Sequence, residues 1–91
     1  MKPLNYAILK YFTKVNEACA EDVIEALKDE YGNFKALKRD AVISALMTAE
    51  ANGLLEETRF EMDKAGNWRV YYHANEEGAA TINKYIKDWW L

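Results

Sequence analysis

Cysteine and proline are almost absent from this sequence, since Cys19 and Pro3 are the only examples in 91 residues. One cysteine excludes an internal disulfide, so we expect Cys19 to be a small buried or helix-capping residue and not a redox switch. No apolar run approaches the roughly 20 residues that a membrane-spanning helix needs, and no signal-peptide core follows Met1-Lys2-Pro3-Leu4. These absences predict a cytoplasmic protein that does not enter a membrane.

Residues that carry out catalysis are also scarce. His73 is the only histidine, and it has no cysteine, aspartate or glutamate at the spacing of a metal site, so we expect it to be a surface residue. The sequence contains neither a glycine-rich phosphate loop nor a nucleophile elbow. We predict that the protein is not an enzyme and that it binds no metal and no cofactor.

The chain does contain enough apolar surface for a core, because 51% of its residues are hydrophobic and 13% are aromatic. Its length predicts a single domain, residues 1–91. A domain of this size buries only roughly 60–65% of the surface of its unfolded chain, so a dimer interface would add stability. The formal net charge of −3 is unusual for a protein that binds nucleic acid, because neutralised phosphates supply much of the affinity of such proteins.

Apolar residues recur at helical spacing in the first half of the chain. They predict three helices, over residues 3–16, 20–31 and 36–52. Pro3 suits the first position of a helix, and Glu21 and Asp22 interact favourably with the dipole of the second helix. Gly53 ends the third helix, because glycine adopts the left-handed conformation at little cost.

The period of the pattern then changes from that of a helix to that of a strand. Residues 54–62 and 68–74 alternate between apolar and polar side chains, and residues 63–67 between them have the composition of a turn. Asn75 is a good N-cap for a last helix over residues 75–90. An isolated hairpin is marginal in water, so it must pack on the helices. The predicted fold is α+β and mostly α, with the element order of a winged helix-turn-helix domain: three helices, a two-stranded β-hairpin wing and a C-terminal helix.

Three segments resemble known regulators. Residues 45–56 (ALMTAEANGLLE) resemble the end of the recognition helix and the start of the wing in winged helix-turn-helix transcriptional regulators. Residues 71–78 (YYHANEEG) resemble the segment that leaves the wing in PadR-like and MarR-like proteins, and Tyr6-Ala7-Ile8-Leu9 is likewise PadR-like. The resemblance implies a bacterial transcription regulator that binds double-stranded DNA, with its third helix in the major groove and its hairpin on the DNA backbone or in the minor groove.

Cationic and hydrogen-bonding residues gather where such a protein would meet DNA. Three cations begin the third helix, two hydroxyl residues lie one turn apart on its outward face, and three further polar residues belong to the wing. Much of the negative charge lies in the second helix, away from this surface. The expected DNA-binding residues are Lys35, Lys38, Arg39, Ser44, Thr48, Lys64, Asn67 and Arg69.

A second interpretation stays open. Ile43 and Met47 lie one turn apart on the expected outward face of the third helix, where a groove-reading helix usually carries polar residues. Glu56, Glu57 and Glu61 make the wing strands acidic, which would repel phosphate. On this interpretation the lysines only solvate a helix start. The protein would then be a winged-helix interaction module, such as an accessory or phage protein, that binds a protein partner through Ile43 and Met47 and does not bind DNA.

Large aromatic residues lie near the end of the sequence. Aromatic residues at helical spacing usually belong to a core, but Trp89 and Trp90 are adjacent and would point about 100° apart on a helix, so they cannot both face the same core. Large apolar groups on a terminal helix indicate an interface, and PadR-like regulators dimerise through such a helix. We expect a homodimer with Tyr85, Trp89 and Trp90 in its interface.

Overall fold

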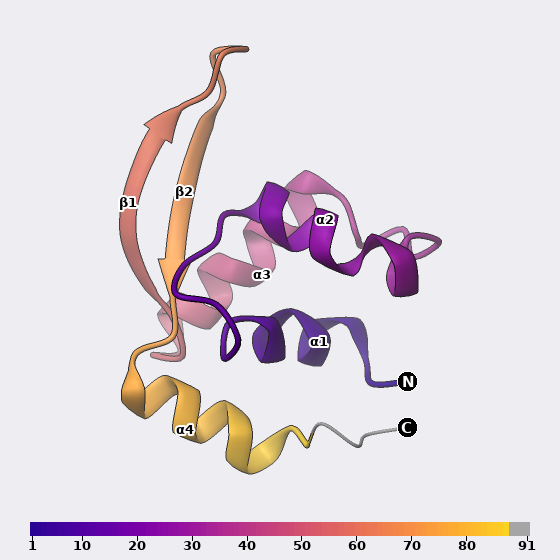
Figure 1. Cartoon of the computed structure of the whole chain (residues 1–91), viewed down its shortest axis with the longest axis vertical. Coiled ribbons are helices and arrows are strands. Elements are labelled where there is room, and N and C mark those ends of the chain that lie inside the picture. Colours follow the sequence, from indigo (N-terminus) through magenta and orange to yellow (C-terminus); the bar gives the residue numbers. More distant parts are fainter. Residues whose placement is uncertain (88–91) are drawn as a thin grey trace.

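The computed structural model describes residues 1–87 and contains, within that range, four helices and one two-stranded antiparallel hairpin (Figure 1). The elements are α1 (Leu4–Tyr11), α2 (Ala20–Tyr31), α3 (Arg39–Ala51), β1 (Glu56–Met62), β2 (Trp68–His73) and α4 (Glu76–Tyr85). The architecture is α+β and mostly helical, which confirms the predicted class and order of elements. The hairpin stands beside the helices with its tip projecting beyond them, and α4 lies at the opposite end (Figure 1).

The first three helices pack around one apolar core. Phe12, Val23 and Leu46 contribute a side chain each and are at most 2% exposed. Tyr31 completes the core at the end of α2, and its hydroxyl donates a hydrogen bond to the backbone oxygen of Lys2 at 2.5 Å. Each fully buried side chain of this size stabilises the fold by roughly 1.5–3 kcal/mol, so these contacts dominate the packing of the helices.

The hairpin is attached to the helices at its root. Ala18, in the connection between α1 and α2, forms a bridge with Tyr72 of β2. The Ala18 amide donates to the Tyr72 carbonyl at 3.0 Å, and the Tyr72 amide donates back at 2.9 Å. The side chains of Leu55 and Tyr72 are also buried in the core. The bridge could not be predicted from the sequence, because a single paired residue has no period.

Asp63 organises the turn between β1 and β2. Its Oδ1 accepts hydrogen bonds from the backbone amides of Ala65 and Asn67, both at 2.9 Å. These bonds, the one from Asn67 most strongly, lower the pKa of the Asp63 carboxyl. Gly66 has a φ of 85°, a conformation that glycine adopts without strain. The turn predicted at residues 63–67 is confirmed.

Cys19 lies at the start of α2 and is fully buried. Asp22 Oδ2 accepts a hydrogen bond from the Cys19 amide at 3.1 Å and another from its Sγ at 3.3 Å. Burial raises the pKa of the Cys19 thiol. The prediction of a small buried or capping residue is confirmed.

The first helix is shorter than predicted, ending at Tyr11 and not at residue 16. The amides of Phe12, Thr13 and Lys14 bond to carbonyls three residues back, and the Thr13 hydroxyl also donates to the Lys10 carbonyl at 2.7 Å. A threonine that bonds to the backbone in this way competes with helical pairing. The turns that replace the helix bring Ala18 to β2.

The third helix begins at Arg39 and not at residue 36. The preceding segment forms turns, in which the Phe34 amide donates to Tyr31 and the Leu37 amide donates to Phe34, at 2.9 and 3.0 Å. Lys35 and Lys38 therefore precede α3, with Lys38 at its N-cap position.

The last helix ends at Tyr85, because Ile86 has an extended backbone (φ −118°, ψ 110°) and buries its side chain. The predicted helix is therefore wrong at residues 86 and 87, and its remaining residues, 88–90, lie outside the described range. The strands begin and end within one or two residues of the predicted bounds, a difference that depends on how element ends are defined.

Leu46→Ala is expected to lower the free energy of unfolding by roughly 2–5 kcal/mol, because it leaves a cavity in a fully buried site. Urea denaturation followed by circular dichroism measures the change. Met47→Ala is the matched control, since Met47 is the next residue and is 57% exposed; its effect should stay within about 0.5 kcal/mol. Equal effects of the two substitutions would contradict this assignment of the core face of α3.

Candidate nucleic-acid interface

The helix α3 has one buried face and one exposed face. Val42, Leu46 and Ala49 point into the core. The opposite face is exposed and carries no lysine or arginine, although the sequence predicted a cationic helix start. Its residues are Asp40, Ser44, Met47, Thr48 and Ala51, and Glu50 is exposed at its edge.

Three lysines lie toward the amino-terminal end of this exposed face, because the contact of Arg39 with Trp68 brings the hairpin tip to the start of α3. Lys35 and Lys38 precede α3, and Lys64 lies in the turn at the tip of the hairpin. All three are exposed and make no ion pair within residues 1–87. Their charge is therefore available to a ligand.

Arg39, by contrast, is engaged within the protein. Its Nε donates to Glu21 Oε2 of α2 at 3.0 Å, and its Nη2 donates to the Trp68 carbonyl of β2 at 2.8 Å. Burial of Glu21 favours its neutral form, but the hydrogen bond and charge of Arg39 outweigh this effect and lower the pKa of Glu21. Arg39 thus joins α2, α3 and the hairpin, a role that its position in the sequence did not indicate.

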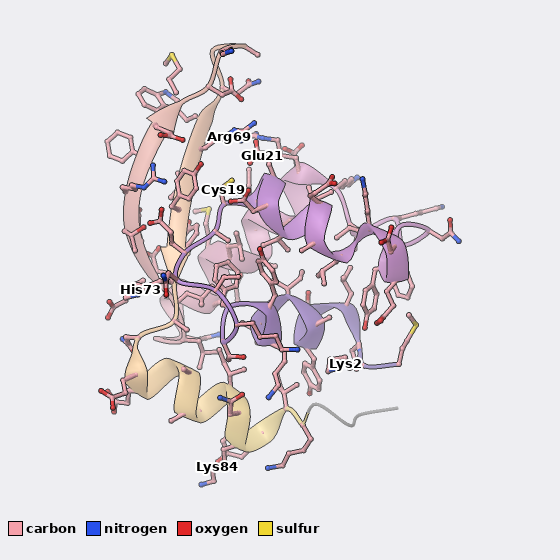
Figure 2. The ribbon with its side chains drawn as sticks, viewed as in Figure 1. Lys2, Cys19, Glu21, Arg69, His73 and Lys84 are labelled. Atoms are coloured by element: carbon pink, nitrogen blue, oxygen red, sulfur yellow. The ribbon has the colours of Figure 1, made fainter. Side chains whose placement is uncertain are left out.

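Arg69 and Asn67 also have partners in the structure. Arg69 Nε donates to Asp63 Oδ2 at 3.4 Å, and its labelled side chain lies near Glu21 and the start of α2 (Figure 2). The strand alternation therefore turns Arg69 away from α3. The side chain of Asn67 is exposed, and its amide belongs to the Asp63 turn.

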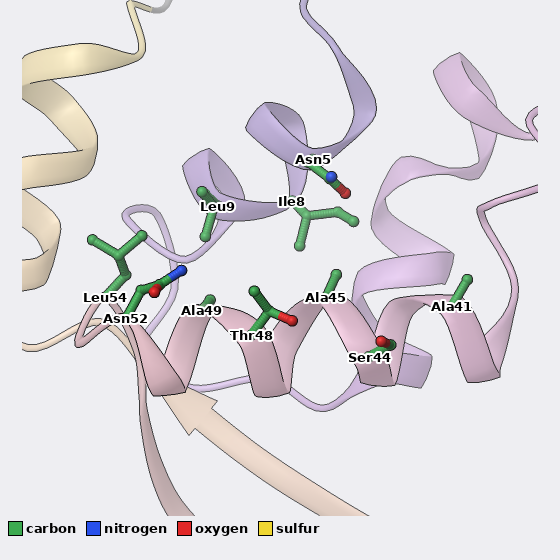
Figure 3. Close-up of a pocket in the computed structure, with 10 residues that line it drawn as sticks. All are labelled: Asn5, Ile8, Leu9, Ala41, Ser44, Ala45, Thr48, Ala49, Asn52 and Leu54. Carbon is green, nitrogen blue, oxygen red and sulfur yellow. The ribbon is translucent and has the colours of Figure 1, made fainter.

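Ser44 and Thr48 lie at the edge of the exposed face. Together with Asn5 and Asn52 they line a hollow of about 340 Å³ between α1 and α3, whose other lining residues are apolar (Figure 3). The two hydroxyl groups follow one another along α3, as the sequence predicted. They face the groove beside α1 as well as the solvent.

Ile43 is not on the outward face, and this part of the sequence interpretation is wrong. Its side chain is half-buried and lines a cavity of about 90 Å³ between α3 and the hairpin, with Met47, Trp68 and Val70. The hairpin covers this side of α3. Met47, at the rim of the same cavity, remains 57% exposed as predicted.

The hairpin carries an exposed apolar surface that was not predicted from the sequence. Phe60, Met62 and Trp68, here called the apolar wing face, are 61%, 53% and 53% exposed. The rings of Phe60 and Trp68 meet edge to face with their centroids 5.4 Å apart. The alternation of apolar and polar residues along the strands predicted that these three residues lie on one side of the hairpin. It also implied that this side is buried. They are exposed because the hairpin projects beyond the helices.

Glu61 lies on the opposite side of the hairpin from the apolar wing face, whereas Glu57, paired with Tyr72, lies on the same side. Glu61 is paired in register with Arg69, whereas Met62 is paired with Trp68, so the two pairs occupy opposite sides of the hairpin. Glu61 accepts a hydrogen bond from Tyr71 at 2.9 Å and from Arg59 at 3.0 Å. Its charge is partly neutralised there.

Two further acidic residues hold the hairpin in place. Glu17 binds Arg59 through two hydrogen bonds, at 2.9 and 2.7 Å, which lower the pKa of Glu17. Glu56 lies at the root, where it contacts His73 at 3.1 Å and accepts a hydrogen bond from Asn75 at 2.5 Å. Glu56 and Glu61 of the wing therefore bind other residues of the protein, whereas Glu57 is exposed.

The predicted dimer residues are only partly within the described range. Tyr85 is 68% exposed on α4, with the ammonium group of Lys84 5.3 Å from its ring centroid. Trp89 and Trp90 lie outside the described residues.

Comparison with known proteins adds no relative: no family model and no curated protein matches the chain. Among residues 1–87, no helix is both long and apolar enough to cross a membrane. In the same range, the acidic, histidine and cysteine side chains form no group of three or more that could hold a metal ion.

Arg39→Ala is expected to lower the free energy of unfolding by about 1 kcal/mol or less at neutral pH, because the ion pair that it breaks is partly exposed. The pKa of Glu21 is lower in the folded protein than its ordinary value of 4.5. The pair therefore stabilises the fold above that value and loses its effect as the pH falls through the folded pKa.

Urea denaturation of wild type and Arg39→Ala across this pH range measures the change. The difference between the two proteins should shrink in acid. Lys38→Ala, which removes a neighbouring lysine without an ion pair among the described residues, should have little effect at any pH. A pH-independent effect of Arg39→Ala would show that the link to the Trp68 carbonyl alone is responsible.

Proposed function

We propose that the protein is a winged helix-turn-helix transcriptional regulator that binds double-stranded DNA. The observation that carries the proposal is the position of Lys35, Lys38 and Lys64. These lysines are exposed and make no ion pair within the described residues; two precede α3, and the third lies at the hairpin tip, which Arg39 joins to the same end of the helix. Phosphate contacts of this kind hold a reading helix in its register on DNA.

The arrangement of the elements supports the same function. The helices α2 and α3 follow one another through a connection over residues 32–38 that forms successive turns, and the hairpin beside α3 corresponds to the wing. The bridge between Ala18 and Tyr72 and the link from Arg39 to Trp68 hold that wing along α3. In a winged-helix complex, α3 would enter the major groove while the wing tip contacts the backbone or the minor groove. The amino-terminal amides of α3 would add a site for phosphate.

Internal ion pairs remove equal positive and negative charge, so the proposal depends on where the exposed lysines lie and not on the net charge of −3. Glu17 and Glu21 bind Arg59 and Arg39, and Asp63 binds Arg69. Few cations remain for phosphate, so the affinity should depend only moderately on salt. Three phosphate contacts per protomer predict a slope of log K against log salt of about −3, or about −5 to −6 for a dimer.

We propose a homodimer as the DNA-binding form. The exposed Tyr85 on α4, with Trp89 and Trp90 after it in the sequence, would supply the apolar contacts. A twofold dimer would present two α3 helices to half-sites about 34 Å apart.

Sedimentation equilibrium tests the dimer. The wild type should have twice the mass of one chain, and Tyr85→Glu should shift it toward the monomer, because a charge would be buried in the interface. Phe34→Glu is the control, since Phe34 is also partly exposed but lies on the connection before α3. A wild type that stays monomeric at high concentration would contradict the proposal.

The double variant Lys35→Glu/Lys38→Glu is expected to lose duplex binding at physiological salt. Each lysine that contacts phosphate contributes about one unit to the salt slope and acts on all DNA sequences alike. Fluorescence anisotropy with genomic duplex fragments, beginning with the promoter region of the protein itself, measures the loss.

The control is Lys28→Glu/Lys87→Glu, which changes the net charge by the same amount but alters lysines on α2 and after α4. It should retain binding. If both double variants lose affinity equally, the effect belongs to total charge and not to the proposed surface. If the wild type binds no duplex even at low salt, the protein does not bind DNA.

An interaction module without DNA binding is the second candidate, and the apolar wing face favours it. Trp68 of this face lines the same cavity as the exposed Met47, and clusters of exposed apolar residues mark binding surfaces. In this case the wild type would bind a protein partner, Met47→Glu would abolish that binding, and no duplex would bind at low salt.

A further inference from the structure

We infer that α3 recognises thymine through its methyl group, so that the preferred duplex is rich in A·T pairs and its bases are read mainly by apolar contact. The inference rests on the proposed function, because it concerns the bases that the exposed face of α3 would meet. It names the chemical class of the DNA site, which the proposed function leaves open.

The exposed face of α3 lacks the side chains that usually read bases. Arginine and lysine bind guanine, and asparagine and glutamine bind adenine, each through paired hydrogen bonds in the major groove. None of these four residue types lies on the exposed face of α3, and Arg39 at its start is bound to Glu21 and Trp68. Purines are therefore without a strong direct reader on this helix.

The exposed face of α3 carries apolar groups. Met47 is 57% exposed, and Thr48 and Ala51 each add a methyl group beside it. Thymine is the one base whose major-groove edge carries a methyl group, and apolar side chains are the groups that contact it. Two exposed carboxylates, Asp40 near the start of the helix and Glu50 near its end, can accept a hydrogen bond only from a donor such as cytosine N4.

The hairpin holds Met47 in position. Its side chain lines the same small cavity as Ile43 and Trp68, so the hairpin packs against one side of it while the other side stays open. Lys35 and Lys38 precede α3, and Lys64 lies at the wing tip, which the contact of Arg39 with Trp68 brings to the same end of the helix. These lysines, which make no ion pair among residues 1–87, would hold the phosphates of a T-rich duplex while Met47 meets its methyl groups.

The test compares two duplexes that differ only in this methyl group. One is an alternating A·T duplex of about two helical turns, roughly 20 base pairs, and the other has deoxyuridine in place of every thymidine. Binding of the full chain to each is measured by fluorescence anisotropy at low salt. The wild type should prefer the thymidine duplex by roughly fourfold for each methyl contact, the value of one buried methyl group.

Met47→Ala should reduce this preference toward one while it retains phosphate-based binding. The matched control is Met62→Ala, which removes the same side chain at nearly the same exposure from the wing; it should keep the preference. Circular dichroism and the urea midpoint confirm that both variants fold, as expected for exposed sites.

The outcomes separate the two proposals. Equal affinity of the wild type for the two duplexes, with binding intact, overturns methyl recognition and leaves DNA binding in place. A preference that is lost in Met62→Ala and kept in Met47→Ala overturns the assignment to α3. No binding of the wild type to either duplex overturns the proposed function itself.

Discussion

The attachment of the hairpin to the helices is the constraint on which the rest of this structure depends. A two-stranded hairpin is marginal by itself in water. Here the backbone pair between Ala18 and Tyr72 holds its root, and the guanidinium of Arg39 binds the Trp68 carbonyl further along. Ile43 and Val70 pack in the space between. These contacts fix the hairpin beside α3, and they decide which side of that helix remains open.

The arginines and lysines of this protein have different roles. The three arginines, at positions 39, 59 and 69, all bind acidic side chains within the protein and all contact or belong to the hairpin. Arg59 also lies over the ring of Tyr71 at 3.9 Å. The planar guanidinium suits such multiple contacts, whereas a lysine ammonium is a flexible point charge. The exposed cations without an ion pair among residues 1–87 thus include the lysines Lys35, Lys38 and Lys64.

Much of the fold could be predicted because its signals are local. The helix over residues 20–31 has the predicted bounds, and the hairpin follows from its alternation and from the Asp63 turn. The ends of α1 and α4 were misplaced because apolar residues continue at helical spacing beyond them. Phe12 and Ile86 are buried, as that spacing indicates, but through turns and an extended segment and not through further helix.

The sequence by itself determined the order of elements, the turn at residues 63–67, the buried Cys19 at the start of α2 and the apolar face of α3. Each of these features depends on residues a few positions apart. Only the tertiary structure decided which charges are paired and which apolar groups are covered. Arg39 and Glu21 are 18 positions apart, and Arg59 and Glu17 are 42 apart. Ile43 is covered by a hairpin that follows it in the chain, whereas Phe60 and Trp68 extend past the helices into solvent. Pairing and cover of this kind arise from contacts between distant segments, which no local pattern encodes.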